Sequence, residues 1–168
     1  MNSQFPYQLV LFLDEQPVVG ETVYSGENGW YPQIALKRRF KFEDIDEEMG
    51  FRYIDEFCKQ LPPKITFKTA QLSTDERMPV KYIPLAEAES LSVYHRRFIE
   101  FMGGHIQSKY PDREGDDYLP HVTAEYDGKM VINPNNYIDR EFILSKLCVL
   151  KDAENDNSVA YRYFKIGE

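Results

Sequence analysis

The sequence predicts an α+β fold built from antiparallel strands and a small number of flanking helices. Three observations favour this class. Short runs rich in aromatic and β-branched residues recur along the chain, bounded by turn-forming residues. Two longer stretches instead repeat apolar residues at three- and four-residue steps, as amphipathic helices do. One short pattern occurs twice, and the 168 residues are most simply a single domain, 1–168.

The first elements are a strand, a loop and a second strand. Residues 7–13 (YQLVLFL) are almost wholly apolar and predict a central strand. Residues 14–29 are rich in Glu, Gly, Pro and Asn and indicate a loop. Tyr24 and Trp30 belong to this region, and their rings either pack against the protein or stack on a base. Residues 31–36 predict the next strand.

A helix and a pair of strands follow. Residues 43–61 have an apolar stripe at helical spacing, although Gly50 inside it should cost about 1 kcal/mol relative to Ala. Residues 64–72 alternate as a strand, and 79–85 are expected to be its shorter partner. Residues 73–78 are expected to form the turn between them.

The C-terminal half begins with a second helix, 86–102, in which His95 is expected on the solvent-facing side. A polar loop, 110–117, leads into the next strand. The remaining strands are expected at 118–126, 129–132, 142–150 and 158–166, with a tight turn at Asp127-Gly128 and the last two strands paired as a hairpin.

The net charge limits the kinds of ligand that the chain can hold. It is −8, whereas a protein that grips many phosphates non-specifically is expected to be basic, because counterion release drives such binding. We therefore expect no broad nucleic-acid surface. A small nucleotide, or one RNA end held in a local pocket, is compatible with the charge.

No resident metal or cofactor is expected. Cys58 and Cys148 lack the spacing of a zinc site or a disulfide framework, and no P-loop or dinucleotide fingerprint occurs. The chain has neither a basic leader region nor an apolar run of membrane-spanning length. The cytoplasm is therefore the expected location, and the oligomeric state stays open.

The candidate site begins with His121 and Thr123, which follow a proline in the stretch 118–126 (YLPHVTAEY). Side chains at positions i and i+2 of a strand point to the same face. An imidazole that titrates near neutral pH would therefore lie beside a hydroxyl donor, a combination suited to handling a phosphate.

The same pattern occurs earlier in the chain with different polar residues. Residues 31–36 (YPQIAL) align without a gap on residues 119–124 (LPHVTA). The proline and the central aliphatic residue repeat, whereas Gln33 replaces the histidine and Ala35 replaces the threonine. The residues that shape the strand are thus repeated, whereas the residues that would face a ligand differ.

Two such proline-led strands in a small α+β chain resemble the 2H phosphoesterase superfamily, which includes the 2′-5′ RNA ligases and cyclic nucleotide phosphodiesterases. The resemblance implies two pseudo-symmetric lobes around a central cleft, with one His-x-Thr/Ser motif from each lobe. By this resemblance His121 and Thr123 form the second motif, and Gln33 and Ala35 occupy the first. In the family the two histidines supply the base and the acid without a metal.

Only one of the two His-x-Thr/Ser motifs is intact in this chain. His121 and Thr123 are the candidate catalytic pair, but the amide of Gln33 cannot transfer a proton. If the strand alternates without a break, Lys37 is in phase with Gln33 and faces the site, whereas Arg38 points away. We therefore expect the cleft to bind a nucleotide or RNA-end phosphate, with weak or no hydrolysis.

Two alternatives stay open. An active metal-independent phosphodiesterase could use Tyr31, Tyr126 or Lys37 as a substitute proton donor. In a second alternative, the acidic and aromatic-rich surface serves protein–protein contact and the fold is only a scaffold. An exposed apolar patch away from both motif strands would favour the scaffold, and a pocket lined by both strands would favour phosphate binding.

Overall fold

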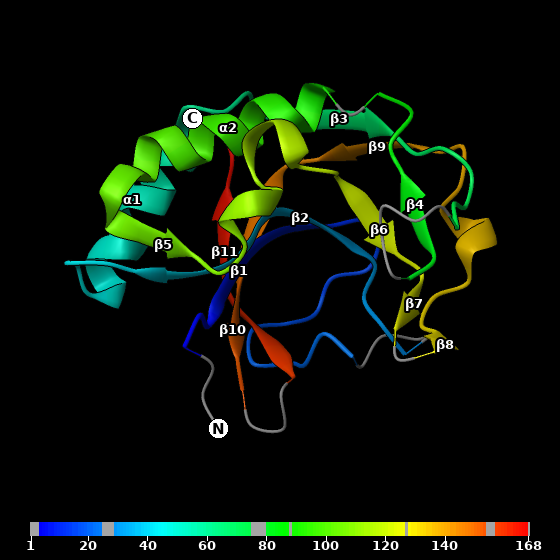
Figure 1. The fold of residues 1–168 in the computed structure, drawn as a ribbon, viewed down its shortest axis with the longest axis horizontal. Helices are drawn as coiled ribbons and strands as arrows, with labels where there is room; N and C mark the ends of the chain where they lie inside the picture. Colours follow the sequence, from blue (N-terminus) through cyan, green and yellow to red (C-terminus); the bar gives the residue numbers. More distant parts are fainter. Residues whose placement is uncertain are drawn as a thin grey trace.

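The structure is a computed structural model and describes residues 4–24, 29–74, 80–87, 89–126, 128–153 and 157–167. Two helices and eleven strands lie in these ranges (Figure 1). The helices are α1 (Glu47–Lys59) and α2 (Glu89–Met102). The strands are β1 (Tyr7–Phe12), β2 (Gln33–Phe42), β3 (Ile65–Lys68), β4 (Tyr82–Pro84), β5 (Ile106–Ser108), β6 (His121–Thr123), β7 (Glu125–Tyr126), β8 (Lys129–Met130), β9 (Glu141–Leu144), β10 (Lys146–Asp152) and β11 (Ser158–Lys165).

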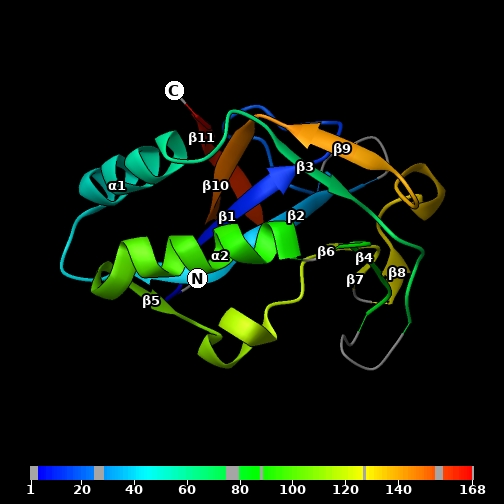
Figure 2. The same cartoon turned by 90° about the horizontal axis from the view of Figure 1, so that it is seen from above.

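One antiparallel sheet dominates the fold. Its strands run in the order β11-β10-β1-β2-β6-β4, and β5 pairs with the far end of β2. Helices α1 and α2 lie together on one side of this sheet, where α1 packs on β11 and α2 packs on β2 (Figure 2). The expected α+β class with antiparallel strands is confirmed, and β10 and β11 form the expected terminal hairpin.

The main core fills the space between the helices and the sheet. Helix α1 begins at Asp46, whose carboxylate accepts a hydrogen bond from the Met49 amide at 2.8 Å. Gly50 does not interrupt this helix. The ring of Phe42 packs so closely on it that a Cβ at that position would lie 2.4 Å from ring carbons. The absence of a side chain at Gly50 therefore leaves room for the Phe42 ring to pack against the core.

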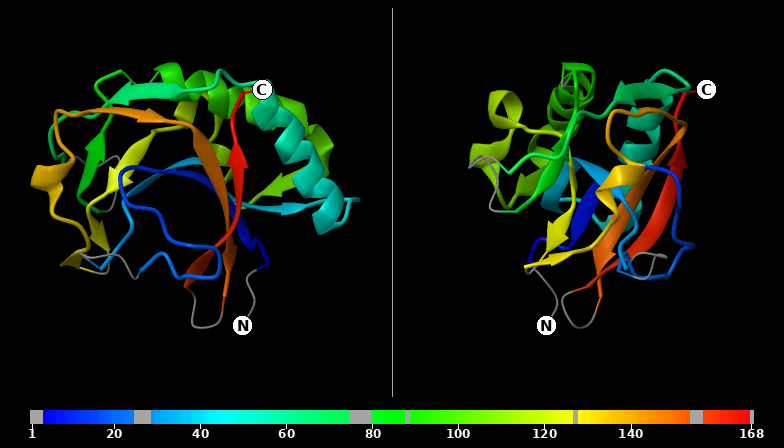
Figure 3. Two further views of the ribbon diagram at one scale, coloured as in Figure 1. Left: turned by 180° about the vertical axis from the view of Figure 1, so that it is seen from behind. Right: turned by 90° about the vertical axis from the view of Figure 1, so that its right-hand side faces the viewer.

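Two strand pairings differ from expectation. The run 142–150 is divided at Ser145, so that β9 pairs with β3 while β10 pairs with β1. Strands β3 and β9 lie side by side along one edge of the molecule (Figure 3). The strand β4 pairs with β6, and only isolated bridges such as Thr69–Leu85 join it to the segment after β3. Sequence proximity favoured a local hairpin, but the longer-range pairing completes the central sheet.

The expected exposure of His95 is wrong. Its ring is only 1% exposed, and it shares the buried stripe of α2 with Leu91, Phe98 and Met102. Positions 91, 95, 98 and 102 follow the spacing of one helical face, so the histidine lies where an apolar residue would be expected. Two backbone hydrogen bonds satisfy both ring nitrogens there, one with the Leu36 carbonyl and one with the Gly115 amide.

Two further sequence predictions concern membrane spanning and turns. Within the described ranges, neither helix combines the length and apolar character that a membrane crossing requires. The predicted turns at 73–78 and Asp127-Gly128 fall largely or partly outside the described residues.

Candidate functional site

The two repeated segments meet at their centres. Ile34 of β2 pairs with Val122 of β6 in antiparallel register, and both side chains are fully buried in the main core. Because side chains alternate along a strand, the residues flanking this pair emerge on the opposite face of the sheet. Gln33, His121 and Thr123 accordingly line one cleft on that face.

The cleft has a volume of about 620 Å³, which lies within the range of small-molecule sites. Its walls come from the two motif strands, the loop after β1, the β7–β8 hairpin and the loop before β6. The described lining residues are Gln8, Val23, Tyr24, Trp30, Gln33, Arg38, Arg39, Val80, Arg113, His121, Thr123, Glu125, Tyr126, Lys129, Val131, Leu150, Asn157 and Ser158.

His121 is held in one orientation. Its Nδ1 lies 2.8 Å from the Leu119 carbonyl oxygen, which can only accept, so Nδ1 carries the proton and Nε2 has a free lone pair. The ring of Tyr82 packs edge-on against the imidazole at 5.6 Å. Burial, together with the nearby positive charge of Arg38, lowers the pKa of His121. The neutral imidazole is therefore the stable form at neutral pH.

Gln33 places a polar side chain in the wall of the cleft. Its Oε1 is buried in the cleft wall and has no hydrogen-bond partner among the described residues. A buried polar atom without a partner is uncommon in folded proteins and costs free energy. Rotation of the amide by half a turn would present its NH₂ group instead, so this side chain can offer either an acceptor or a donor to a ligand.

Strand β2 does not alternate without a break. Val10 pairs with Ala35 and Leu9 with Lys37, so one step along β1 corresponds to two steps along β2. A second shift follows, because Tyr7 pairs with Phe40. Such bulges insert an extra residue and change the direction in which later side chains point.

The bulges reverse the expected roles of the basic residues. Leu36 and Lys37 are both buried, whereas the next two residues, Arg38 and Arg39, both line the cleft. The expectation that Lys37 faces the site was wrong. Its side chain is 1% exposed, and its Nζ lies 2.5 Å from a carboxylate oxygen of Glu114 and 3.0 Å from the Arg38 carbonyl.

Of the two candidate tyrosines, one lines the cleft and the other does not. Tyr31 is buried in a second cluster of apolar residues, where its ring packs edge-on against Phe12 at 6.2 Å, and it does not line the cleft. Tyr126 is 56% exposed and does line it. The ring centroid of Trp30 lies 5.5 Å from that of Tyr126 and 5.9 Å from that of Tyr24. The cleft thus has an aromatic wall beside its polar residues.

Arginines are the functional candidates that sequence reasoning missed. Arg38, Arg39 and Arg113 all line the cleft. Arg39 donates to both carboxylate oxygens of Asp152 at 2.6 Å. Burial lowers the pKa of Arg38, as do the positive charges of Arg113 and Arg39. The run 37–39 marks a cationic region in the sequence, but no sequence signal indicates where the strand bulges.

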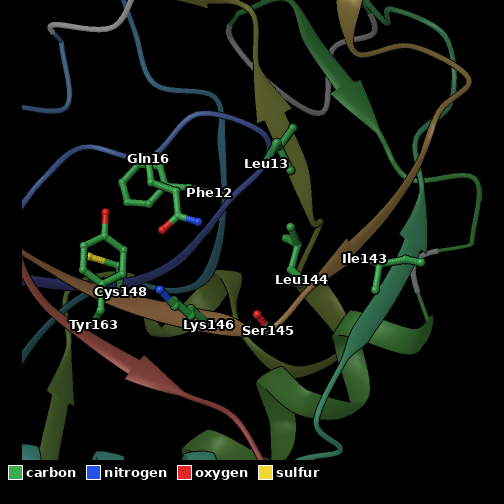
Figure 4. A pocket seen from close by; sticks show the side chains of 9 residues that line it. All are labelled: Phe12, Leu13, Gln16, Ile143, Leu144, Ser145, Lys146, Cys148 and Tyr163. Atoms are coloured by element: carbon green, nitrogen blue, oxygen red, sulfur yellow. The ribbon is translucent and has the colours of Figure 1, made fainter.

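A smaller hollow lies on the same sheet near β10 and β11, with a volume of about 150 Å³ (Figure 4). Phe12, Cys148 and Tyr163 lie on one side of it, and Lys146 is the basic residue in its lining. This volume is below the usual range for a nucleotide-sized ligand. No group of three or more metal-binding side chains is found within the described part of the chain.

No protein-family model matches the chain, and no curated protein matches its sequence. Solved structures nevertheless match nearly all of it. The crystal structure of a phosphoesterase superposes with a TM-score of 0.62 at 9% sequence identity, covering 97% of this chain and 98% of that one. With the paired motif strands, this likeness shows that the chain has the fold of the 2H phosphoesterases.

Structures of E. coli LigT are also similar to the chain. The complex with 3′-AMP has a TM-score of 0.60 at 11% identity, covering 97% of this chain and 98% of that chain. The complex with NADP⁺ has a TM-score of 0.55 at 11% identity, covering 97% and 99%. E. coli LigT has also been crystallised with ATP and with phosphate.

Proposed function

We propose that the cleft binds the phosphate of a nucleotide or of an RNA end, and that hydrolysis there is weak or absent. The observation that carries this proposal is the pairing of Ile34 with Val122, which brings Gln33, His121 and Thr123 to one cavity. The nucleotide complexes of E. coli LigT, which has the same fold, support a nucleotide as the ligand.

Four of the lining residues have a role in this proposal. The Thr123 hydroxyl and the Gln33 amide would donate hydrogen bonds to phosphate oxygens. Arg38, and not the first-expected Lys37, supplies a positive charge to this cleft, and a guanidinium binds phosphate oxygens in a paired, charge-assisted geometry. A nucleobase would lie against Tyr126, whose side chain is the most exposed of the aromatic wall.

Weak hydrolysis follows from the number of groups that can move a proton. His121 has a free Nε2 and a lowered pKa, so it could act as a base toward water. A second group would have to protonate the leaving oxygen, and neither the Gln33 amide nor an arginine does so at neutral pH. A positioned acid or base is usually worth about 10²–10⁴ in rate.

The first test measures binding and turnover on the same protein. Isothermal titration with adenosine 3′-monophosphate should show binding that weakens at least several-fold in Thr123→Val. Incubation with 2′,3′-cyclic nucleotides and 2′-5′-linked oligonucleotides should show little product. Turnover that is fast in the wild type and lost in His121→Ala would contradict the weak-hydrolysis proposal. An absence of heat with every ligand would remove the binding proposal.

A second test asks whether the first motif can be restored. The double substitution Gln33→His with Ala35→Thr would return both chemical residues to their motif positions. If the rest of the site is retained, cyclic-nucleotide hydrolysis should rise in this variant and fall again when His121→Ala is added. The single substitution Ala35→Thr is the control, because it restores no group that transfers a proton.

One alternative retains a specific observation in its favour. Tyr126 lines the cleft, so it is a proton donor that an active phosphodiesterase could use. Tyr31 and Lys37 no longer fit this role, since both are buried away from the cleft. Activity that is lost in Tyr126→Phe as well as in His121→Ala would favour this alternative.

A further inference from the structure

The charge of the cleft is opposite to that of the chain. Four cationic side chains and one carboxylate are found among its described lining residues, whereas the chain as a whole has a net charge of −8. The cations are Arg38, Arg39, Arg113 and Lys129, and the carboxylate is Glu125. A single phosphodiester has only one negative charge. The lining residues therefore have more positive charge than one diester would neutralise.

Two of the arginines have no carboxylate partner in the part of the chain that the structure describes. Arg39 is neutralised by Asp152, as described above. Among the described residues, no carboxylate lies within ion-pair distance of Arg38 or Arg113. The guanidinium of Arg38 lies 5.2 Å from the ring of Tyr110 and is half-buried. Keeping a half-buried cation beside another cation is unfavourable, and an anionic ligand would relieve that cost.

The backbone next to Arg113 is anchored. Glu114 pairs with the buried Lys37, and the amide of Gly115 donates to Nε2 of His95 at 3.1 Å. Both anchors directly follow Arg113 in the chain. The loop thus presents Arg113 to the cleft from an anchored backbone, so the ordering cost on ligand binding is limited mainly to the exposed side chain.

We propose that Arg38 and Arg113 form a second phosphate subsite next to His121 and Thr123, so that the cleft takes a nucleotide with two separate phosphate groups. This inference rests on the proposed function and narrows its ligand class. One phosphate would lie against Gln33, Thr123 and His121. The second, a terminal phosphomonoester with two negative charges, would lie between the two guanidiniums.

Isothermal titration with three probes tests this subsite. The probes are adenosine 3′-monophosphate, adenosine 5′-monophosphate and adenosine 3′,5′-bisphosphate. We expect the bisphosphate to bind roughly tenfold or more tightly than either monophosphate, because one additional charge-assisted contact is gained. Arg113→Gln should remove most of that advantage and leave the affinity for adenosine 3′-monophosphate nearly unchanged, since its phosphate lies against Thr123 in this proposal. Arg113→Lys should restore part of it.

Lys129→Gln is the matched control, since it removes one cation from the same cleft. A general effect of positive charge would make this variant lose as much of the bisphosphate advantage as Arg113→Gln, and that result would overturn the subsite. Equal affinities for all three probes would also overturn it. If Thr123→Val still weakens the monophosphates in that case, the proposed function stands and only the second subsite fails.

Discussion

Lys37 Nζ lies 2.5 Å from Oε1 of Glu114, and this ion pair joins the bulged part of β2 to the loop before β6. The lysine is buried, and Glu114 is only 16% exposed. Burial lowers the pKa of Lys37, and the adjacent carboxylate opposes that change. The pair therefore lies behind the cleft and holds one of its walls, rather than contacting a ligand.

Removing one partner of this pair should be costly. Glu114→Gln leaves the buried Lys37 ammonium without a countercharge, with only neutral oxygens, the Arg38 carbonyl and the introduced amide, as hydrogen-bond acceptors. We expect the free energy of unfolding to fall by about 3 kcal/mol, as for other buried ions that lose their partner. Urea denaturation followed by circular dichroism measures this change.

The neighbouring Asp116→Asn serves as the control, because Asp116 is exposed in the same loop. It should change stability by no more than about 0.5 kcal/mol. The double variant Lys37→Met with Glu114→Gln should recover most of the loss, since no buried charge then lacks a partner. If Glu114→Gln is as stable as Asp116→Asn, the ion pair does not hold this loop.

The two proline-led strands could be predicted from sequence, whereas their direct pairing through Ile34 and Val122 and the arginine side of the cleft could not. A repeated proline and a repeated aliphatic residue are local signals, and each marks one strand. The turning of Arg38 into the cleft depends on two register shifts between β1 and β2, which arise from pairing with a distant strand. Strict alternation therefore assigned Lys37 and Arg38 to the wrong faces.

His95 shows a second limit of local reasoning. Its helical position places it on the buried stripe, but a histidine is usually assigned to the polar face. Contacts from other segments stabilise the buried ring. The Leu36 carbonyl and the Gly115 amide hydrogen-bond to its nitrogens, and the ring of Tyr118 stacks on it at a centroid distance of 3.9 Å. Partners so far apart in sequence cannot be deduced from helical periodicity.

Gly50→Ala should destabilise the protein although alanine is the better helix former. The added methyl would overlap the ring of Phe42, which is itself held by Tyr7 at 4.8 Å and Phe51 at 5.9 Å. Overpacking of this kind typically costs about 1–3 kcal/mol, whereas the gain in helix propensity is about 1 kcal/mol. We expect a lower thermal midpoint in differential scanning calorimetry.

Two variants distinguish this overlap from a general effect of substituting glycine. Gly104→Ala places its methyl in open space and should be close to neutral. Combining Gly50→Ala with Phe42→Leu should cost less than the sum of the two single changes, because the smaller side chain makes room. A Gly50→Ala protein that is more stable than the wild type would contradict the close packing of Phe42.

Tyr126→Ala should weaken nucleotides more than inorganic phosphate. Its ring is exposed in the cleft and packs against the ring of Trp30. Stacking of a base on such a ring is worth about 1–3 kcal/mol. Titration of adenosine 3′-monophosphate and phosphate with both proteins measures the difference, and Tyr31→Phe is the buried control. Equal weakening of both ligands would mean that no base stacks on Tyr126.

The free energy of unfolding should depend on pH in a way that reports the lowered pKa of His95. Both of its ring nitrogens are used in the neutral form, with Nδ1–H donating to Leu36 and Nε2 accepting from Gly115. Burial is the main cause that lowers its pKa, and Lys37 and Arg96 lower it further, although the Leu36 carbonyl and Glu114 act in the opposite direction. The folded protein therefore binds this proton less readily than the unfolded chain, in which the pKa is about 6.5.

The contribution of His95 to stability is consequently complete above about pH 6.5 and is lost as the pH falls toward the lowered pKa of the folded state. Urea denaturation at several pH values should show a decrease of at most about 1.4 kcal/mol per pH unit for this proton, with His121 adding in the same direction. In His95→Gln, which keeps one donor and one acceptor, the decrease should be smaller. His105→Gln is the exposed control, and a wild-type slope in His95→Gln would show that folding does not lower the pKa of this histidine.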